Sequence, residues 1–222
     1  MISVIVPTFN EEKEIGGLLS ALALQKVETI LVDGGSTDRT VSLAKKYPVK
    51  IIMSEKGRSQ QMNVGALHAS GDVLIFLHAD CRLDNKAFTT ITTLIKQGYV
   101  GGGFLHKIDS DKLIYRVIEF SGNIRARLLK IFYGDQAIFI RKNCFHKLGG
   151  FDTVSLFEDI LFSKKMKRLG PVIIAKQHVL ASPRRWEKRG ILKTSVLFWL
   201  FTMLFLFGIL PHDMSRLYRD VR

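Results

Sequence analysis

Three aspartates stand at places where their carboxylates could do chemistry. Asp33 follows the apolar run 30–32, Asp80 follows the run 72–77, and Asp159 opens a segment with helical periodicity. The carboxyl ends of parallel strands share one rim of an α/β sheet, and ligands bind at that rim. We therefore expect the three carboxylates to meet around one cleft.

Asp33 is suited to binding a nucleoside. Gly34 and Gly35 allow a tight turn after it, so its carboxylate can face a base or ribose hydroxyl at the rim. The alternative is a carboxylate that only caps its own turn or pairs with Arg39.

The other two aspartates suit a cation and a proton. Carboxylate oxygens are the ligands that Mg²⁺ and Mn²⁺ prefer, so Asp80 is a candidate metal ligand. Asp159 could act as a general base toward an attacking hydroxyl, with Glu158 beside it as the second choice. The alternative for Asp159 is a carboxylate that only complements the dipole of its helix.

The elements that must position these residues alternate along the first half of the chain. Apolar runs predict strands at 2–6, 28–32, 49–53 and 72–77, and helical periodicity follows each of them. This order predicts an α/β fold with a mostly parallel sheet flanked by helices. In the second half we expect strands at 100–106, 136–141 and 171–175, a helix over 111–132 that breaks at Gly122, and a helix over 159–169 with Leu169 facing inward.

The composition is apolar and basic. The 222 residues carry a net charge of +13 and are 47% hydrophobic, and residues 160–222 alone hold 13 Lys and Arg against three acidic residues. Such a charge favours an anionic neighbour. The two cysteines show no paired spacing, which favours a reducing compartment, and the first residues lack the basic segment of a signal peptide.

The segment Thr194–Leu210 has 17 residues without a charge and basic residues on both sides. A bilayer span needs about 20 residues. The pattern predicts peripheral contact with a membrane, with a buried helix or a helix that pairs with a second copy of the chain as the alternatives. Because the basic residues flank an apolar segment instead of alternating with aromatic residues, we expect lipid and not nucleic acid as the partner. This places the protein in the cytoplasm at the inner face of the cell membrane.

Several motifs, taken together and in order, resemble the family 2 glycosyltransferases with a GT-A fold. They are "VIVPTFNEE", "VDGGSTD", "GRSQQMNVGALHASGD", "FLHAD" and "GGFD" followed by "FEDILFSKKMKRLG". The chain is most similar to a small bacterial subgroup with "HAD" in place of Asp-x-Asp and "RRW" before a hydrophobic tail. The resemblance implies a Rossmann-like GT-A domain over residues 1–190 and a separate tail over 191–222.

The resemblance also implies roles for individual residues. It assigns the general base to Asp159 and a divalent cation, Mn²⁺ or Mg²⁺, to Asp80. His78 replaces the first aspartate of the family pattern, and imidazole suits Mn²⁺ better than Mg²⁺. His178 follows a predicted strand and is a further candidate ligand. The donor site would comprise Pro7, Thr8, Glu11, Asp33, Arg58, His78 and Asp80, and the acceptor site Gly150, Asp152, Arg185 and Trp186, with Asp135 and Gln136 near the sugar.

The sequence thus predicts an inverting, metal-dependent transfer of a sugar, from a nucleotide-diphosphate donor of the UDP-hexose type to a hydroxyl acceptor that is lipid-linked. A sugar-phosphate nucleotidyltransferase is the second enzyme considered, but the first loop, "PTFNEE", is acidic where a triphosphate or dinucleotide needs glycines and basic residues. A third alternative is a degenerate protein that only binds nucleotide sugar or membrane, because Gly34 and His78 depart from the family pattern.

Overall fold

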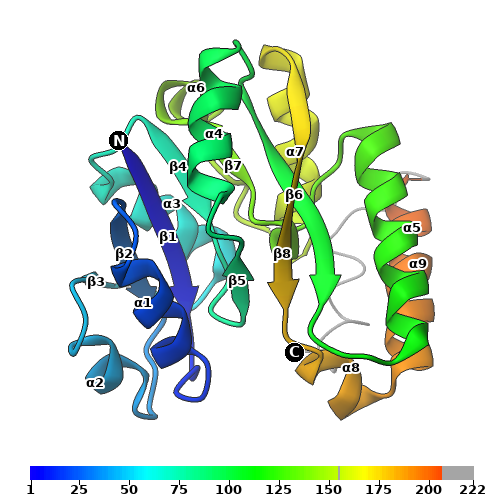
Figure 1. The fold of residues 1–222 in the computed structure, drawn as a ribbon, viewed down its shortest axis with the longest axis horizontal. Helices are drawn as coiled ribbons and strands as arrows, with labels where there is room; N and C mark the ends of the chain where they lie inside the picture. Colours follow the sequence, from blue (N-terminus) through cyan, green and yellow to red (C-terminus); the bar gives the residue numbers. More distant parts are fainter. Residues whose placement is uncertain (155, 207–222) are drawn as a thin grey trace.

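The computed structural model describes residues 1–154 and 156–206. Its centre is an eight-stranded sheet with the order β3-β2-β1-β4-β7-β6-β8-β5. Four strand pairings are parallel and three, which involve β7 or β5, are antiparallel. Helices lie on both faces of this sheet (Figure 1). The α/β class with a mostly parallel sheet is as predicted.

The first half supplies the parallel part of the sheet. Since β1, β2, β3 and β4 run the same way, their carboxyl ends meet at one rim, at the bottom of Figure 1. Its elements are β1 (Ile2–Thr8), α1 (Ile15–Ala23), β2 (Glu28–Asp33), α2 (Thr40–Ala44), β3 (Lys50–Met53), α3 (Arg58–His68), β4 (Val73–Phe76), β5 (Cys81–Leu83) and α4 (Ala87–Lys96).

The second half completes the sheet and adds a group of helices beside it. Its elements are β6 (Gly101–Ile108), α5 (Leu113–Leu129), the 3₁₀ turn η1 (Gly134–Gln136), β7 (Phe139–Arg141), α6 (Lys142–Lys147), α7 (Glu158–Leu169), β8 (Val172–Ala181), α8 (Arg184–Arg189) and α9 (Ile191–Leu206). No helix among the described residues is both long and apolar enough to cross a bilayer.

Alternating strand residues build a core on each face of the sheet. Val4 and Val6 of β1 pack with α1 and α4, while Ile5 packs on the other face with α3 and α7. This is the period of two that a strand imposes. Each strand that ends at the rim is therefore anchored on both sides, which fixes the loops that follow it.

The glycine run of β6 is required by close backbone packing. A Cβ on Gly102 would lie 1.8 Å from the Ile173 carbonyl oxygen, and one on Gly101 would lie 2.3 Å from the Phe139 oxygen. These distances are far below van der Waals contact. Only glycine therefore fits at these two positions of β6.

Three local predictions are wrong. Helix α5 continues through Gly122 without a break, because the packing of α5 outweighs the weak helix propensity of one glycine. Leu169, expected to face inward, is 39% exposed because it is the last residue of α7. The strand predicted over 171–175 extends to Ala181, since it pairs with both β6 and β5. Residues 207–210 of the predicted apolar segment lie outside the described part of the chain.

Candidate active site

Asp33 sits at the rim where β2 ends, and it is fully buried. Its Oδ2 accepts hydrogen bonds from the backbone N–H of Gly35 (3.0 Å) and of Ser36 (2.7 Å), and its Oδ1 accepts one from the Ser36 hydroxyl. Asp33 therefore shapes its own turn, as the alternative interpretation held. This turn fixes the shape of the rim beside Thr8, because Thr8 of β1 is the strand partner of Asp33.

The side chain of Gln61 explains the glycine at position 34. Its Nε2 donates to the carbonyl oxygens of Thr8 (2.7 Å) and Val32 (2.8 Å), and so ties α3 to the ends of β1 and β2. A Cβ on Gly34 would lie 3.1 Å from this nitrogen. Any side chain at position 34 would therefore require Gln61 to shift by a few tenths of an ångström.

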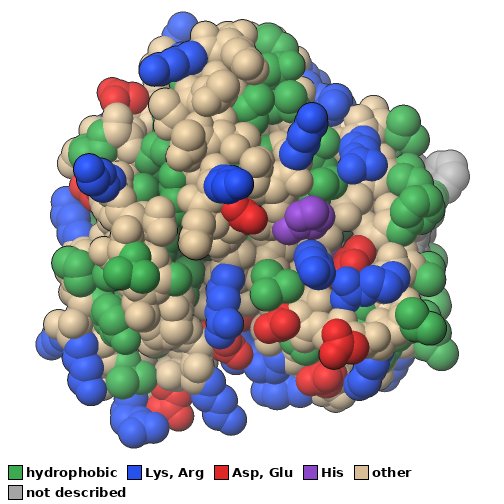
Figure 2. All heavy atoms as spheres, in the orientation of Figure 1, with side chains coloured by type: hydrophobic (Ala, Val, Ile, Leu, Met, Phe, Trp, Pro, Cys, Tyr) green, Lys and Arg blue, Asp and Glu red, His purple; other side chains and the backbone are tan. Residues whose placement is uncertain are grey.

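Glu11, in the first loop, is paired with a residue from the far end of the chain. Its Oε2 lies 2.7 Å from Nη2 of Arg184, at the start of α8. Burial raises the pKa of Glu11, an effect opposed by the arginine and supported by the nearby charge of Asp80. Glu11, Arg184 and Asp80 thus form one charged group at the rim, where Figure 2 shows side chains of both signs gathered.

Asp80 belongs to the only candidate metal cluster among the described residues. Potential ligand atoms of His78, Asp80 and Cys81 lie within 4.8 Å of one another. The carboxylate suits Mg²⁺ and Mn²⁺ alike, the imidazole is a poorer ligand for Mg²⁺ than for Mn²⁺, and the thiol is a soft donor that suits neither. Asp80 and His78 therefore fit Mn²⁺ better than Mg²⁺. The backbone N–H of Ser182 donates to the Asp80 carbonyl oxygen (3.0 Å) and holds this segment against the end of β8.

Asp159 lies beside His78 across Gly134. The backbone N–H of Gly134 donates to Asp159 Oδ2 at 2.7 Å, and a Cβ on Gly134 would lie 2.6 Å from His78 Nε2. Burial and then the charge of Glu158 raise the pKa of Asp159 to about 7. A carboxylate with this pKa can accept a proton near neutral pH, which is what a general base requires.

Glu158 is a buried partner of Arg58. The two side chains form an ion pair with Arg58 Nη1 3.3 Å from Glu158 Oε1, and the glutamate is only 3% exposed. Arg58 opens α3, just after the rim end of β3, so this pair joins the first half of the chain to α7. The charge of Arg58 also reaches Asp159 and favours its ionised form.

The predicted donor residues come together at the rim. The predicted ligand His178 and the predicted acceptor residues have separate surroundings. His178 is exposed, lies on β8 opposite Leu105, and does not belong to the cluster around Asp80. Asp152 forms an ion pair with Lys165 of α7. Gly150 has a left-handed backbone (φ +74°), and Asn63 of α3 hydrogen-bonds to the residue after it. Trp186 is buried, and the Arg185 side chain lies outside the described part of the chain.

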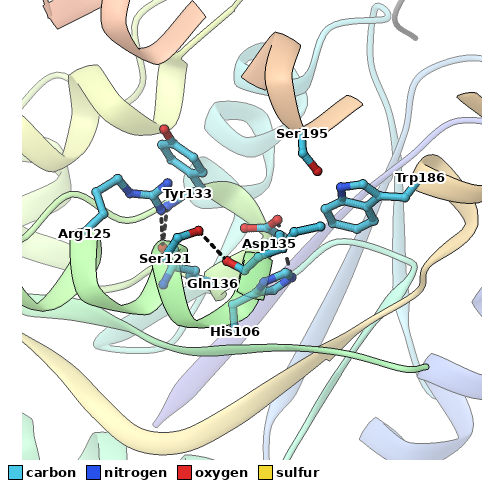
Figure 3. Close-up of a pocket in the computed structure, with 10 residues that line it drawn as sticks. His106, Ser121, Arg125, Tyr133, Asp135, Gln136, Trp186 and Ser195 are labelled. Carbon is cyan, nitrogen blue, oxygen red and sulfur yellow. Dashed lines mark hydrogen bonds and ion pairs between the residues drawn. The ribbon is translucent and has the colours of Figure 1, made fainter. Parts of the chain in front are cut away.

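The structure adds a pocket that the sequence did not reveal. It lies between α5, η1 and the start of α9, and Trp186 forms one wall (Figure 3). Asp135 and Gln136 were expected near the sugar from the "GDQ" motif, whereas His106, Arg125 and Tyr133 were missed. The only signal for His106 was its position near the end of the glycine-rich strand.

A charged rim at the carboxyl ends of parallel strands is typical of α/β proteins that bind a ligand at that rim. Residues 3–156 match the family described as "Glycosyl transferase family 2", and the chain belongs to this family. The family predicted from the sequence, and with it the glycosyltransferase class of enzyme, is confirmed.

Two relatives illustrate the family. The chain is 38% identical over 120 residues to dolichol-phosphate mannosyltransferase of Pyrococcus furiosus, covering 46% of this chain and 34% of that one. It is 33% identical over 130 residues to 4,4'-diaponeurosporenoate glycosyltransferase of Staphylococcus haemolyticus, covering 53% and 34%. The aligned region is thus about a third of the length of these relatives.

Solved structures confirm the GT-A fold. Residues 1–349 of Staphylococcus aureus TarS superpose with a TM-score of 0.64 at 21% identity, covering 83% of this chain and 61% of that one. The mannosyltransferase PcManGT of Pyrobaculum calidifontis, solved with GDP-Man and Mn²⁺, gives 0.63 at 20% identity, covering 81% and 56%. At such identities the likeness concerns the fold.

Proposed function

We propose that the protein transfers a sugar from a nucleoside-diphosphate donor to a hydroxyl acceptor, with inversion at the anomeric carbon. The observation that carries this proposal is Asp159, a carboxylate with a pKa of about 7 that lies beside His78 and shares the rim with Asp80. A base, a candidate cation site and an arginine near one rim of the sheet are the parts that such a transfer needs.

The mechanism follows from where charge develops. The acceptor hydroxyl attacks the anomeric carbon on the face opposite the leaving diphosphate, and Asp159 removes the hydroxyl proton as the bond forms. Gly134 holds the base in place through its N–H. Asp80 and His78 would hold a divalent cation, which when bound offsets the negative charge on the leaving diphosphate. No general acid is then needed for the leaving group.

The donor is proposed to be a nucleotide hexose, with UDP as the first choice. Proteins of this fold have been solved with UDP-GlcNAc and with GDP-Man and Mn²⁺, which supports a nucleotide sugar and a manganese ion here. In this chain Pro7, Thr8, Glu11 and the Asp33 turn form the rim loops proposed to receive the nucleoside, and Arg58 is placed to approach the phosphates.

The acceptor is proposed to be lipid-linked, with the protein at the inner face of the cell membrane. Two relatives are named for dolichol phosphate and for 4,4'-diaponeurosporenoate, both lipids. Helices α5 and α9 carry exposed apolar residues at helical spacing, here called the apolar face (Figure 2, right edge). Its members are Leu113, Val117, Phe120, Ile124 and Leu128 of α5 and Leu192, Val196, Leu200 and Met203 of α9.

The transfer is tested by incubating the protein with a panel of nucleotide sugars, with Mn²⁺ or Mg²⁺, and identifying the products. Release of free nucleoside diphosphate from one donor, faster with Mn²⁺, is the expected result. Release of pyrophosphate from a nucleoside triphosphate and a sugar phosphate would instead identify a nucleotidyltransferase. Absence of turnover with every donor and acceptor would favour a degenerate binding protein.

Membrane contact is tested by flotation with vesicles that contain anionic lipid. Replacing Phe120 and Leu128 with glutamate should abolish flotation, because both charges would have to enter the lipid interface. Leu24→Glu is the matched control, since Leu24 is 84% exposed just after the end of α1, away from the apolar face. Unchanged flotation of the double variant would refute the contact, and a concentration-dependent dimer that the variant disrupts would assign the apolar face to a second copy.

A further inference from the structure

A surface groove at the corner between α8 and α9 has no role in the transfer mechanism. Its volume is about 530 Å³, within the roughly 300–1,000 Å³ that ligand sites occupy. Among the described residues it shares only Trp186 with the pocket of Figure 3. The residues that define it, here called the corner groove, are Lys112, Trp186, Glu187, Ile191, Leu192 and Lys193.

The corner groove carries charges of both signs. Lys112, which precedes α5, has its Nζ 3.7 Å from Oε1 of Glu187 on α8, beyond ordinary hydrogen-bond length. Their side chains are 59% and 49% exposed, and such an exposed ion pair adds little to stability. Lys193, on the first turn of α9, brings a second cation to the lining. Figure 2 shows side chains of both signs over α8, at the lower right. A ligand can therefore separate the loose pair and bind between its charges.

The mixture of charges restricts the kind of ligand. Asp111 and Lys188, which are the chain neighbours of the pair, are exposed, lie outside the lining and have opposite signs. The lining itself holds two ammonium groups and one carboxylate. A simple anion would face the Glu187 carboxylate at short range, and a simple cation would face both lysines. A ligand that carries a phosphate and an ammonium group together can pair with all three.

One edge of the corner groove is apolar and continues into the apolar face. Leu192 lines the groove and is also a member of that face, and Leu113, another member, follows Lys112 in the chain. These two leucines are 71% and 82% exposed. A charged groove at the end of an exposed apolar surface suits an amphiphile, with its head group in the groove and its acyl chains along the apolar face.

Trp186 decides which ammonium group fits. Its ring packs edge-on against that of Tyr115 with 6.0 Å between the ring centres, and only 7% of the residue is exposed. A trimethylammonium group is bound by open aromatic faces, and this ring offers none to the groove. A primary ammonium group instead donates hydrogen bonds to a carboxylate such as that of Glu187.

We propose that the corner groove binds the head group of a membrane phospholipid that carries a phosphate and a primary ammonium group, as phosphatidylethanolamine does. Lys112 and Lys193 hold the phosphate, and Glu187 accepts hydrogen bonds from the ammonium group. The lipid anchors the protein and is not a substrate. The proposal rests on the membrane contact proposed above and names the lipid that this contact selects.

The test is flotation of the full chain with two sets of vesicles. Both hold the same share of phosphatidylglycerol, and the remainder is phosphatidylethanolamine in one set and phosphatidylcholine in the other. We expect binding to the ethanolamine set to be about fivefold tighter, the upper range of what one exposed ion pair contributes. Soluble glycerophosphoethanolamine should reduce this binding, whereas inorganic phosphate at equal ionic strength should not. Equal binding to both sets, or equal competition by phosphate, would overturn the proposal.

Glu187→Gln tests the contact with the ammonium group. Its binding to the ethanolamine vesicles should fall to the level of the choline vesicles. Asp111→Asn is the matched control, because it removes a neighbouring exposed carboxylate outside the lining and should keep the preference. The control is needed because the two lipids also differ in how they pack in a bilayer. A preference that survives in Glu187→Gln would contradict the assignment.

Lys112→Met tests the contact with the phosphate. Binding to both sets of vesicles should weaken by about fivefold, the usual effect of one lysine near a membrane surface. Lys86→Met makes the same change in net charge at an exposed position before α4, outside the corner groove and the apolar face, and should bind as the parent does. Equal losses in the two variants would show that only the overall charge matters and would refute the site.

Flotation of the parent protein separates this proposal from the membrane contact on which it rests. If neither set of vesicles binds, the membrane contact itself fails. If both sets bind equally and the Phe120/Leu128 double variant binds neither, the membrane contact stands and the head-group site fails alone. Release of nucleoside diphosphate is measured without vesicles, so the transferase function is judged independently of both results.

Discussion

The two sides of the cleft differ in how completely their polar groups are satisfied. On the side of the first strands, Asp33 is occupied by its own turn, Glu11 by Arg184, and Gln61 by two carbonyl oxygens. On the side of α5 and η1, His106 and Arg125 keep buried polar atoms without hydrogen bonds among the described residues. The hydrogen bonds of Asp33, Glu11 and Gln61 are thus formed before any ligand arrives, whereas these polar atoms of His106 and Arg125 can still accept or donate one.

This difference indicates that the two sides have different roles in binding a ligand. A rim that is already hydrogen-bonded offers a fixed shape and loses little entropy when it binds the common part of the donor. Open polar atoms in an aromatic pocket discriminate between ligands, because a ligand that leaves them unsatisfied is rejected. Asp159 lies between the two sides and is held by both, through the Arg58–Glu158 pair and through Gly134.

The largest expected effect comes from removing the base between the two sides. Asp159→Asn keeps the shape and an acceptor for the Gly134 N–H but cannot take a proton. Transfer should fall by about 10²–10⁴, the usual contribution of general base catalysis, while nucleoside-diphosphate binding stays within twofold. Rates of nucleoside-diphosphate release with saturating acceptor measure this. A loss below tenfold would move the base role to Glu158.

The second prediction concerns the Arg58–Glu158 ion pair, which joins α3 to α7. Arg58→Met leaves Glu158 buried without this partner and should lower the free energy of unfolding by about 1–3 kcal/mol. Arg39→Met is the matched control, because the Arg39–Glu12 pair is exposed and should cost less than about 1 kcal/mol. Urea unfolding of both variants measures the two losses in free energy of unfolding. Equal losses of unfolding free energy in the two variants would mean that the burial of Glu158 does not affect stability.

The third prediction disturbs the contact between η1 and His78. An added methyl in Gly134→Ala would meet the His78 ring at 2.6 Å and must push it away from Asp80 or shift η1. We expect transfer to fall about tenfold, with metal affinity lowered as well. In Gly16→Ala the new methyl meets only Tyr47 at 3.8 Å, so activity should not change. A fully active Gly134→Ala would show that this contact does not position the site.

The fourth prediction concerns pH and is the smallest effect. Asp159 must be ionised to act, so the transfer rate should rise with pH through about 7 and level off above it. The folded state keeps the proton that the unfolded state releases near pH 3.8, so Asp159 costs stability as the pH rises from about 4 to 7, by at most about 1.4 kcal/mol per unit. Asp159→Asn should remove this slope in thermal unfolding. A wild-type rate that is flat between pH 5 and 8 would contradict the raised pKa.

Much of the donor side was predictable because its signals are local. An apolar run that stops at Asp33 or before Asp80 marks the end of a strand, and parallel order then places these ends at one rim. The sequence offered the turn around Asp33 as an alternative, and the Ser36 contact bears it out. It could not show that Gln61 would fill the space at Gly34, because that contact depends on the packing of α3 against the sheet.

The side of α5 and η1 was less predictable because its residues meet only through tertiary packing. His106, Arg125 and Trp186 come from β6, α5 and α8, and no spacing in the sequence links them. His178 failed to join the metal cluster for a related reason. The strand predicted over 171–175 continues past it to Ala181, which leaves the histidine on an exposed position of β8.

The central claim is that Asp80 and its neighbours at the rim serve a diphosphate and a cation. Calorimetric titration of UDP and GDP, with and without Mn²⁺, on the wild type and on Asp80→Ala tests it most directly. We predict that Mn²⁺ strengthens nucleotide binding to the wild type and leaves binding to Asp80→Ala unchanged. Binding that ignores Mn²⁺ in both proteins, or that responds equally in both, would contradict the account.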